Sequence, residues 1–111
     1  MPLRDDSVSI RQMLDHAREA VALVGVRSRE HLDSDRVLTL ALVQLAQIVG
    51  EAAGRVSDAK RALHPEIPWS QIIALRNRLV HGYDTIDLAI LWEITTRDMP
   101  TLISHLEKIL P

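Results

Sequence analysis

Apolar residues recur at helical spacing along almost the whole chain. Near the N-terminus they occupy one helix face, with charged residues opposite; that face consists of Ile10, Met13, Leu14, Ala17, Val21 and Val24. Asp5, Asp6 or Ser7 can cap the start of this helix. Gly25 can end it, because glycine tolerates the backbone conformation that follows a helix. The pattern predicts a first helix between these signals.

The second predicted helix starts after Ser34 and runs to about Val56. Its apolar residues surround it on nearly all sides, so we expect it to be the central and most buried helix. Its most apolar stretch, residues 37–49, is too short to span a bilayer. Ser57 can cap a short continuation through Leu63.

The second half of the chain is predicted to be helical as well. Two prolines within residues 64–68 break the pattern, and helical spacing resumes from residue 69 to about residue 80. Residues 82–85 form a predicted turn, residues 86–95 another helix, and Pro100 kinks or restarts the last apolar stripe. No strand pattern of useful length is visible. We therefore predict a single all-α domain over residues 1–111, an up-and-down bundle of four to five helices.

Composition narrows the chemistry. The 111 residues include no cysteine, which excludes disulfides, thiolate metal sites and a thiol nucleophile. The net charge of −2 argues against broad electrostatic binding of nucleic acid but leaves a local basic site open. The N-terminus lacks the apolar run of a signal peptide, so we expect a soluble cytoplasmic protein without membrane contact. The Glu-x-x-His signature of di-metal bundles is absent, and no metal site is predicted.

Residues 69–83 carry the candidate chemistry. On a continuous helix at 100° per residue, Arg76 falls at about 40° inside the apolar arc, and Arg78 falls on the opposite, solvent side. Asn77 and His81 are four residues apart and would be neighbours on the edge of that arc. A guanidinium in an apolar stripe is costly unless it is paired or faces a shared cavity. Taken singly, these residues are more often surface or packing groups than catalytic ones.

In combination, these residues resemble a known family. Arg76, Asn77, His81 and Tyr83 form the pattern R-N-x3-H-x-Y, and the flanking segments His64-Pro65-Glu66-Ile67-Pro68-Trp69 and Ile86-Asp87 extend the likeness. The stretch from about residue 64 to residue 110 is similar to the HepT-type HEPN toxins, which are small helical proteins encoded beside a minimal nucleotidyltransferase antitoxin.

The resemblance implies a metal-independent endoribonuclease that needs no cofactor and acts on RNA such as tRNA or mRNA. Two protomers would meet as a homodimer at one cleft, with Arg76 and His81 catalytic and Asn77 supporting them. His81 would move protons and Arg76 would hold the phosphate. Tyr83 would be the residue that the antitoxin modifies with AMP, which would block the cleft with charge and bulk. The chain would then be the toxin of a type VII-like toxin–antitoxin pair.

Two other interpretations remain open at this stage. The domain could be a non-catalytic accessory subunit that binds a nucleotide or substrate for a nucleotidyltransferase; the scarcity of aromatic residues, 3% of the chain, slightly favours this. It could also be a structural helical dimer in which Arg76 pairs with a carboxylate such as Asp87 across the interface. Toxicity on expression separates the first of these from a ribonuclease, and the stability of an Arg76 variant separates the second.

Overall fold

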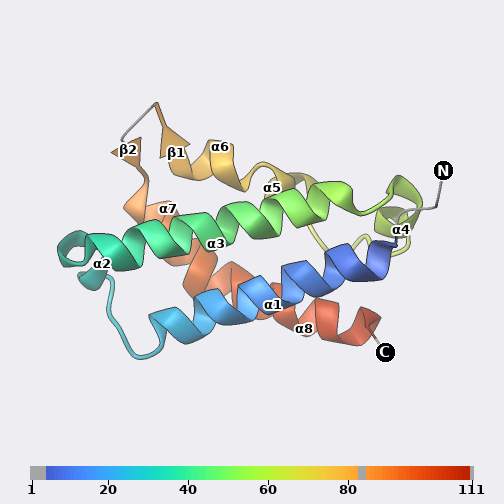
Figure 1. Cartoon of the computed structure of the whole chain (residues 1–111), viewed down its shortest axis with the longest axis horizontal. Coiled ribbons are helices and arrows are strands. Elements are labelled where there is room, and N and C mark those ends of the chain that lie inside the picture. Colours follow the sequence, from blue (N-terminus) through green and yellow to red (C-terminus); the bar gives the residue numbers. More distant parts are fainter. Residues whose placement is uncertain (1–4, 83–84, 111) are drawn as a thin grey trace.

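The chain folds as a bundle of helices with one small β-ribbon (Figure 1). The computed structural model describes residues 5–82 and 85–110. Its elements are α1 (Asp6–Val24), α2 (His31–Ser34), α3 (Arg36–Arg55), α4 (Asp58–Ala62), α5 (Trp69–Ile73), α6 (Leu75–Leu79), β1 (Val80–His81), β2 (Thr85–Ile86), α7 (Leu88–Glu93), the π-helix η1 (Ile94–Asp98) and α8 (Met99–Ile109). The predicted all-α class is confirmed.

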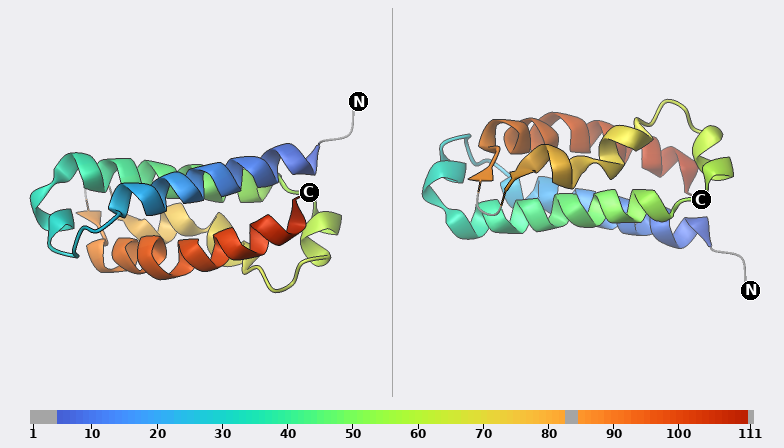
Figure 2. Two further views of the ribbon diagram at one scale, coloured as in Figure 1. Left: turned by 90° about the horizontal axis from the view of Figure 1, so that it is seen from below. Right: turned by 90° about the horizontal axis from the view of Figure 1, so that it is seen from above.

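Four rods run up and down the long axis of the molecule. They are α1, α3, the pair α5–α6, and the continuous run α7–η1–α8 (Figures 1 and 2). Helix α1 packs against α3 and α8, while α3 also packs against α5 and α6. The most deeply buried large side chains come from all four rods; they include Met13, Leu42, Leu79 and Leu106, each fully inaccessible. Burial of this apolar surface is the main force that holds the rods together.

The predicted helix caps are present. The Asp5 carboxylate accepts hydrogen bonds from the Ser7 hydroxyl at 2.6 Å and the Ser7 backbone N–H at 3.0 Å, and α1 ends at Gly25. These two bonds lower the pKa of Asp5, which keeps the cap ionised. Ser57 caps α4 through the backbone N–H of Lys60. Helix α3 has a cap that was not predicted: the Asp35 side chain accepts a hydrogen bond from the backbone N–H of Leu38 at 3.0 Å.

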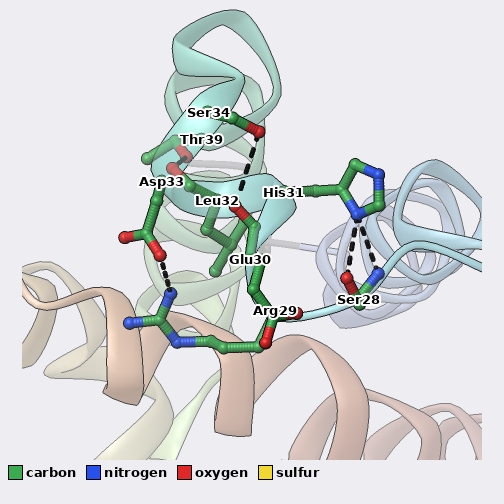
Figure 3. A network of polar contacts seen from close by, with 8 residues as sticks. All are labelled: Ser28, Arg29, Glu30, His31, Leu32, Asp33, Ser34 and Thr39. Atoms are coloured by element: carbon green, nitrogen blue, oxygen red, sulfur yellow. Dashed lines mark hydrogen bonds and ion pairs between the residues drawn. The ribbon is translucent and has the colours of Figure 1, made fainter.

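The short helix α2 between α1 and α3 was not predicted. Polar contacts within four residues hold it, as Figure 3 shows: the Ser28 backbone N–H donates to His31 Nδ1 at 3.0 Å, and Arg29 pairs with Asp33 at 3.4 Å. The buried Thr39 hydroxyl then ties α2 to α3 by donating to the Leu32 carbonyl at 2.8 Å. A helix of one turn has no apolar period to detect, so the pattern of the sequence does not reveal it.

Helix α3 occupies the centre of the bundle, as predicted, but it is not buried on all sides. Val37 is 79% exposed and Leu40 is 44% exposed near its N-terminal end. By length and composition alone α3 could cross a membrane, yet 56% of that apolar window is buried inside the protein. Helices of this kind also form the cores of soluble proteins, and the packing of α3 against α1, α5 and α6 matches that case.

The second half departs from the prediction in two places. Residues 69–79 form two helices separated at Ala74, and Val80–His81 then pairs with Thr85–Ile86 as an antiparallel ribbon, where no strand was expected.

In the last rod, Pro100 lies in the first turn of α8, directly after the π-helix. Because proline lacks an N–H, the helix widens in the turn before it and restarts.

Candidate active site

The residues of the R-N-x3-H-x-Y pattern lie on α6 and on the β-ribbon that follows it. Arg76 and Asn77 belong to α6, and His81 is the last residue of β1. Leu79, which is fully buried, anchors the end of α6 in the core. Tyr83 lies outside the described residues.

The predicted burial of Arg76 is wrong for the single chain. Arg76 is exposed, whereas Arg78 is partly buried, the reverse of the helical-wheel prediction. The reason is the interruption at Ala74, whose ψ of 8° departs from helical values and shifts the phase of α6 relative to α5. Ile73, expected inside the apolar arc, is 38% exposed. A wheel drawn through residues 69–80 assumes one continuous helix, and that assumption fails here.

Asn77 and His81 are not neighbours on a helix either. Helix α6 ends at Leu79, and Val80 takes an extended conformation with φ −113° and ψ 119°. His81 therefore stands on the ribbon, opposite Thr85, and its side chain is 55% exposed. Gly82, which follows it, has a φ of +73°, a left-handed backbone conformation that glycine adopts without strain.

The guanidinium of Arg76 and the amide of Asn77 contact no polar side chain in the part of the chain that the structure describes. Within residues 5–82 and 85–110, neither Arg76 nor Asn77 makes a side-chain hydrogen bond or ion pair, and both are exposed. An exposed guanidinium without a carboxylate partner is available for a phosphate, which it can bind through two parallel hydrogen bonds.

His81 does have a partner. Its Nε2 lies 3.7 Å from Oδ2 of Asp87, a residue of the turn between β2 and α7. The structural-dimer interpretation paired Asp87 with Arg76 across an interface, and no site prediction placed it beside His81. The sequence signal that could have located it is the hairpin: Gly82 at a turn, with His81 and Asp87 at flanking positions.

A well-formed groove of the described chain lies elsewhere. It has a volume of about 380 Å³ and runs between α5–α6 and η1–α8, two rods that lie side by side in Figure 2. Apolar residues such as Ile72 and Leu102 line it together with Arg78 and His105, but Arg76, Asn77 and His81 do not. The pattern residues are therefore exposed on the surface of a single chain and lie outside this groove. Among the described residues, no three His, Asp or Glu side chains are grouped as metal ligands would be.

The fold and this surface define a small helical domain with an exposed Arg, Asn and His on one short helix–ribbon unit. Residues 13–109 match the family described as "Ribonuclease HepT-like". The match covers nearly the whole chain, and the protein belongs to this HepT-like ribonuclease family. The family resemblance predicted from residues 64–110 is thereby confirmed.

Similar proteins that carry curated names are also named as ribonucleases. The chain is 30% identical over 105 residues to "Probable ribonuclease HepT" of Thermococcus cleftensis, which covers 91% of this chain and 96% of the relative. It is 26% identical over 109 residues to "Putative RNase MJ1380" of Methanocaldococcus jannaschii, with 98% and 100% covered. No solved structure matches the chain.

Proposed function

We propose that this protein is the toxin of a type VII-like toxin–antitoxin pair, a metal-independent endoribonuclease that works as a homodimer in the cytoplasm. Membership of a ribonuclease family makes RNA the substrate class. The observation that carries the proposal is the exposed site on α6 and β1: Arg76 is free of any carboxylate among the described residues, and His81 stands beside one.

These groups suit cleavage of RNA by its own 2′-hydroxyl. A neutral imidazole takes the proton of the 2′-hydroxyl, the 2′-oxygen bonds to phosphorus, and the bond from phosphorus to the 5′-oxygen breaks. A protonated imidazole gives the leaving 5′-oxygen its proton. The products are a 2′,3′-cyclic phosphate and a 5′-hydroxyl. Arg76 binds the phosphate and stabilises the charge that grows on it, and Asn77 orients the phosphate or His81.

A homodimer supplies what one chain lacks. One imidazole cannot be neutral base and protonated acid at the same time, whereas two protomers bring two His81 side chains to one cleft. Arg76, Asn77 and His81 are exposed and lie outside the groove between α5–α6 and η1–α8, which favours a second copy that would complete the cleft around them. Three residues before Arg76 in the chain, Ile73 is 38% exposed, which is apolar surface that an isologous contact would cover.

The proposed partner is a minimal nucleotidyltransferase that transfers AMP from ATP to the hydroxyl of Tyr83. The hydroxyl oxygen bonds to the α-phosphorus, pyrophosphate leaves, and the hydroxyl proton passes to solvent. Tyr83 is two residues from His81, so the added phosphate would repel RNA from the cleft.

Cleavage assays with matched variants test the ribonuclease. Purified protein should cut tRNA or mRNA and leave 2′,3′-cyclic phosphate ends. His81→Ala should slow the reaction by about 10²–10⁴-fold, the usual contribution of a general acid–base group. His16→Ala is the control, because His16 lies on α1, outside the R-N-x3-H-x-Y pattern, and its Nδ1 contacts the Gln12 carbonyl at 2.8 Å. Intact RNA with the folded wild-type protein, over a range of RNAs, would contradict the proposal.

The groove gives some support to the accessory-subunit alternative. Its volume of about 380 Å³ lies within the range of small-molecule sites, and Arg78 and Arg97 offer positive charge there, although the carboxylates of Glu66 and Asp98 line it too. A non-catalytic subunit would bind a nucleotide without harming the cell. Growth arrest on expression of the chain alone, abolished by His81→Ala, favours the ribonuclease; unaffected growth with measurable nucleotide binding favours the alternative.

A further inference from the structure

We propose that Asp87 is a positioning residue that fixes the tautomer and direction of the His81 imidazole. In this arrangement the Asp87 carboxylate accepts a hydrogen bond from Nε2–H, and Nδ1 is left to exchange the proton with RNA. The catalytic part of this inference rests on the proposed ribonuclease function. The contact between the two side chains does not, and it can be measured separately.

The β-ribbon brings the two residues to the same face. Val80 pairs with Ile86 and His81 with Thr85, so the next pair in the register is Leu79 with Asp87. The Asp87 backbone N–H indeed donates to the Leu79 carbonyl at 2.8 Å. Asp87 is thus two positions beyond the direct partner of His81. Side chains in this diagonal relation lie on one face of an antiparallel pair and within reach of each other.

Two hydrogen bonds hold Asp87, one at its carboxylate and one at its backbone N–H. Its Oδ1 accepts a hydrogen bond from the backbone N–H of Ile90 at 3.0 Å, which makes Asp87 the N-cap of α7. Its own backbone is fixed by the bond to Leu79, a fully buried residue. With Oδ1 engaged, Oδ2 is the oxygen that faces His81, and the side chain is only 32% exposed. A carboxylate pinned in this way costs little further entropy when it binds the imidazole.

The separation of 3.7 Å between Nε2 and Oδ2 is longer than a hydrogen bond. His81 is 55% exposed and can rotate toward Asp87 by the required fraction of an ångström. Such bonds are often long in the free enzyme and shorten when substrate arrives. No other ion pair of His81 occurs within the described ranges 5–82 and 85–110, and its Nδ1 has no hydrogen-bond partner there.

This geometry assigns a task to each ring nitrogen. When Nδ1 takes the proton from the 2′-hydroxyl, the imidazole becomes positively charged, and the charge lies beside the Asp87 carboxylate that stabilises it. When Nδ1 gives a proton to the 5′-oxygen, the ring returns to the Nε2–H form that Asp87 favours. Asp87 itself keeps its charge throughout and touches no reacting atom.

Asp87→Asn separates this role from helix capping. Asparagine is as good an N-cap as aspartate, so its carbonyl oxygen can keep the bond to Ile90. Its NH₂ group then faces His81 and donates to Nε2, which favours the opposite tautomer, with the proton on Nδ1. Asp35→Asn is the matched control, because Asp35 caps α3 through Leu38 with the same geometry, and within residues 5–82 and 85–110 its carboxylate forms no ion pair with a histidine: only its backbone N–H meets one, at the His31 carbonyl.

The first measurement is the ¹⁵N shift of both ring nitrogens of His81, at a pH of about 8 where an imidazole is neutral. We expect the Nε2–H form to predominate in the wild type and in Asp35→Asn, and the Nδ1–H form to rise in Asp87→Asn. The same tautomer ratio in all three proteins would overturn the proposal, whether or not the protein cleaves RNA.

The second measurement is cleavage at saturating and limiting RNA. Asp87→Asn should lower kcat by roughly 10- to 100-fold, part of the total contribution of an acid–base group, and leave KM near its wild-type value. Asp35→Asn should change neither. An active wild type with an unchanged kcat in Asp87→Asn would refute the positioning role. A wild type that cuts no RNA, but whose His81 tautomer depends on Asp87, would contradict the ribonuclease and retain the contact.

Discussion

Gly50 of α3 lies against the backbone of Ile72 in α5, so closely that a Cβ at residue 50 would stand 2.8 Å from the Ile72 carbonyl oxygen. Real Cβ atoms essentially never approach a backbone oxygen to that distance. Ile72 lies two residues before the interruption at Ala74 that sets the direction of α6. The absence of a side chain at Gly50 therefore helps to place the helix that bears Arg76 and Asn77.

Gly50→Ala should destabilise the protein by about 1–3 kcal/mol, because α5 must move away to relieve the contact. A loss of this size corresponds to a fall in Tm of at least about 4 °C in a domain of this length. Thermal unfolding followed by circular dichroism measures it.

Gly54→Ala is the control for Gly50→Ala. It lies one turn further along α3, and a Cβ there meets nothing within 4 Å. Alanine is the better helix former, so this variant should gain about 0.5–1 kcal/mol. Equal effects of the two substitutions would show that the close approach at Gly50 does not matter.

The comparison of sequence and structure explains which parts of the fold are predictable. The caps at Asp5 and Ser57 are local signals, because each side chain bonds a backbone N–H two or three residues ahead. The break at Ala74 is not local: it coincides with the approach of α3 at Gly50, some twenty residues earlier in the chain. Periodicity alone therefore predicted one helix where there are two.

The same reason limits the prediction of the site. The pattern of Arg76, Asn77 and His81 is visible in the sequence, but their exposure depends on where α6 starts and ends. The proximity of His81 to Asp87 depends on the register of a ribbon with two residues in each strand. Gly82 indicates a turn, but strands of two residues have no alternation to detect, so the register that brings His81 to Asp87 emerges only from the structure.

Arg76→Ala should slow RNA cleavage strongly without destabilising the chain. Arg76 is exposed and has no side-chain partner among the described residues, so its loss should change the free energy of unfolding by less than about 0.5 kcal/mol. Removal of a group that stabilises the charged phosphate should slow cleavage by roughly 10²–10³-fold. Chemical denaturation and a cleavage assay on the same preparation measure both quantities.

Arg78→Ala should lower the stability of the chain and leave RNA cleavage intact, the reverse of Arg76→Ala. Arg78 is partly buried and lines the groove between α6 and α8, so truncation removes packing and should cost about 1 kcal/mol. Cleavage should persist. A marked loss of stability in Arg76→Ala, with cleavage intact, would instead favour the interpretation in which Arg76 pairs with a carboxylate across a dimer.

Chelation should leave cleavage unchanged. The proposed mechanism uses imidazole and guanidinium groups alone, so an excess of EDTA should not alter the rate by more than about twofold. A metal-dependent nuclease assayed in the same buffer serves as the positive control for chelation. A rate that falls at least tenfold and returns on addition of a divalent cation would contradict metal independence and leave the roles of Arg76 and His81 to be reassigned.

Incubation with the cognate nucleotidyltransferase and ATP should add AMP to Tyr83. Intact-mass measurement should show one or more increments of an AMP group, and peptide mapping should locate them at this residue. The added phosphate carries negative charge close to His81, so cleavage by the modified protein should fall at least tenfold. Tyr83→Phe is the matched variant because it removes only the acceptor hydroxyl: it should cleave RNA, gain no mass and escape inhibition by ATP-dependent modification. Increments that persist in Tyr83→Phe would place the modification elsewhere, and full activity of the modified wild type would separate modification from inhibition.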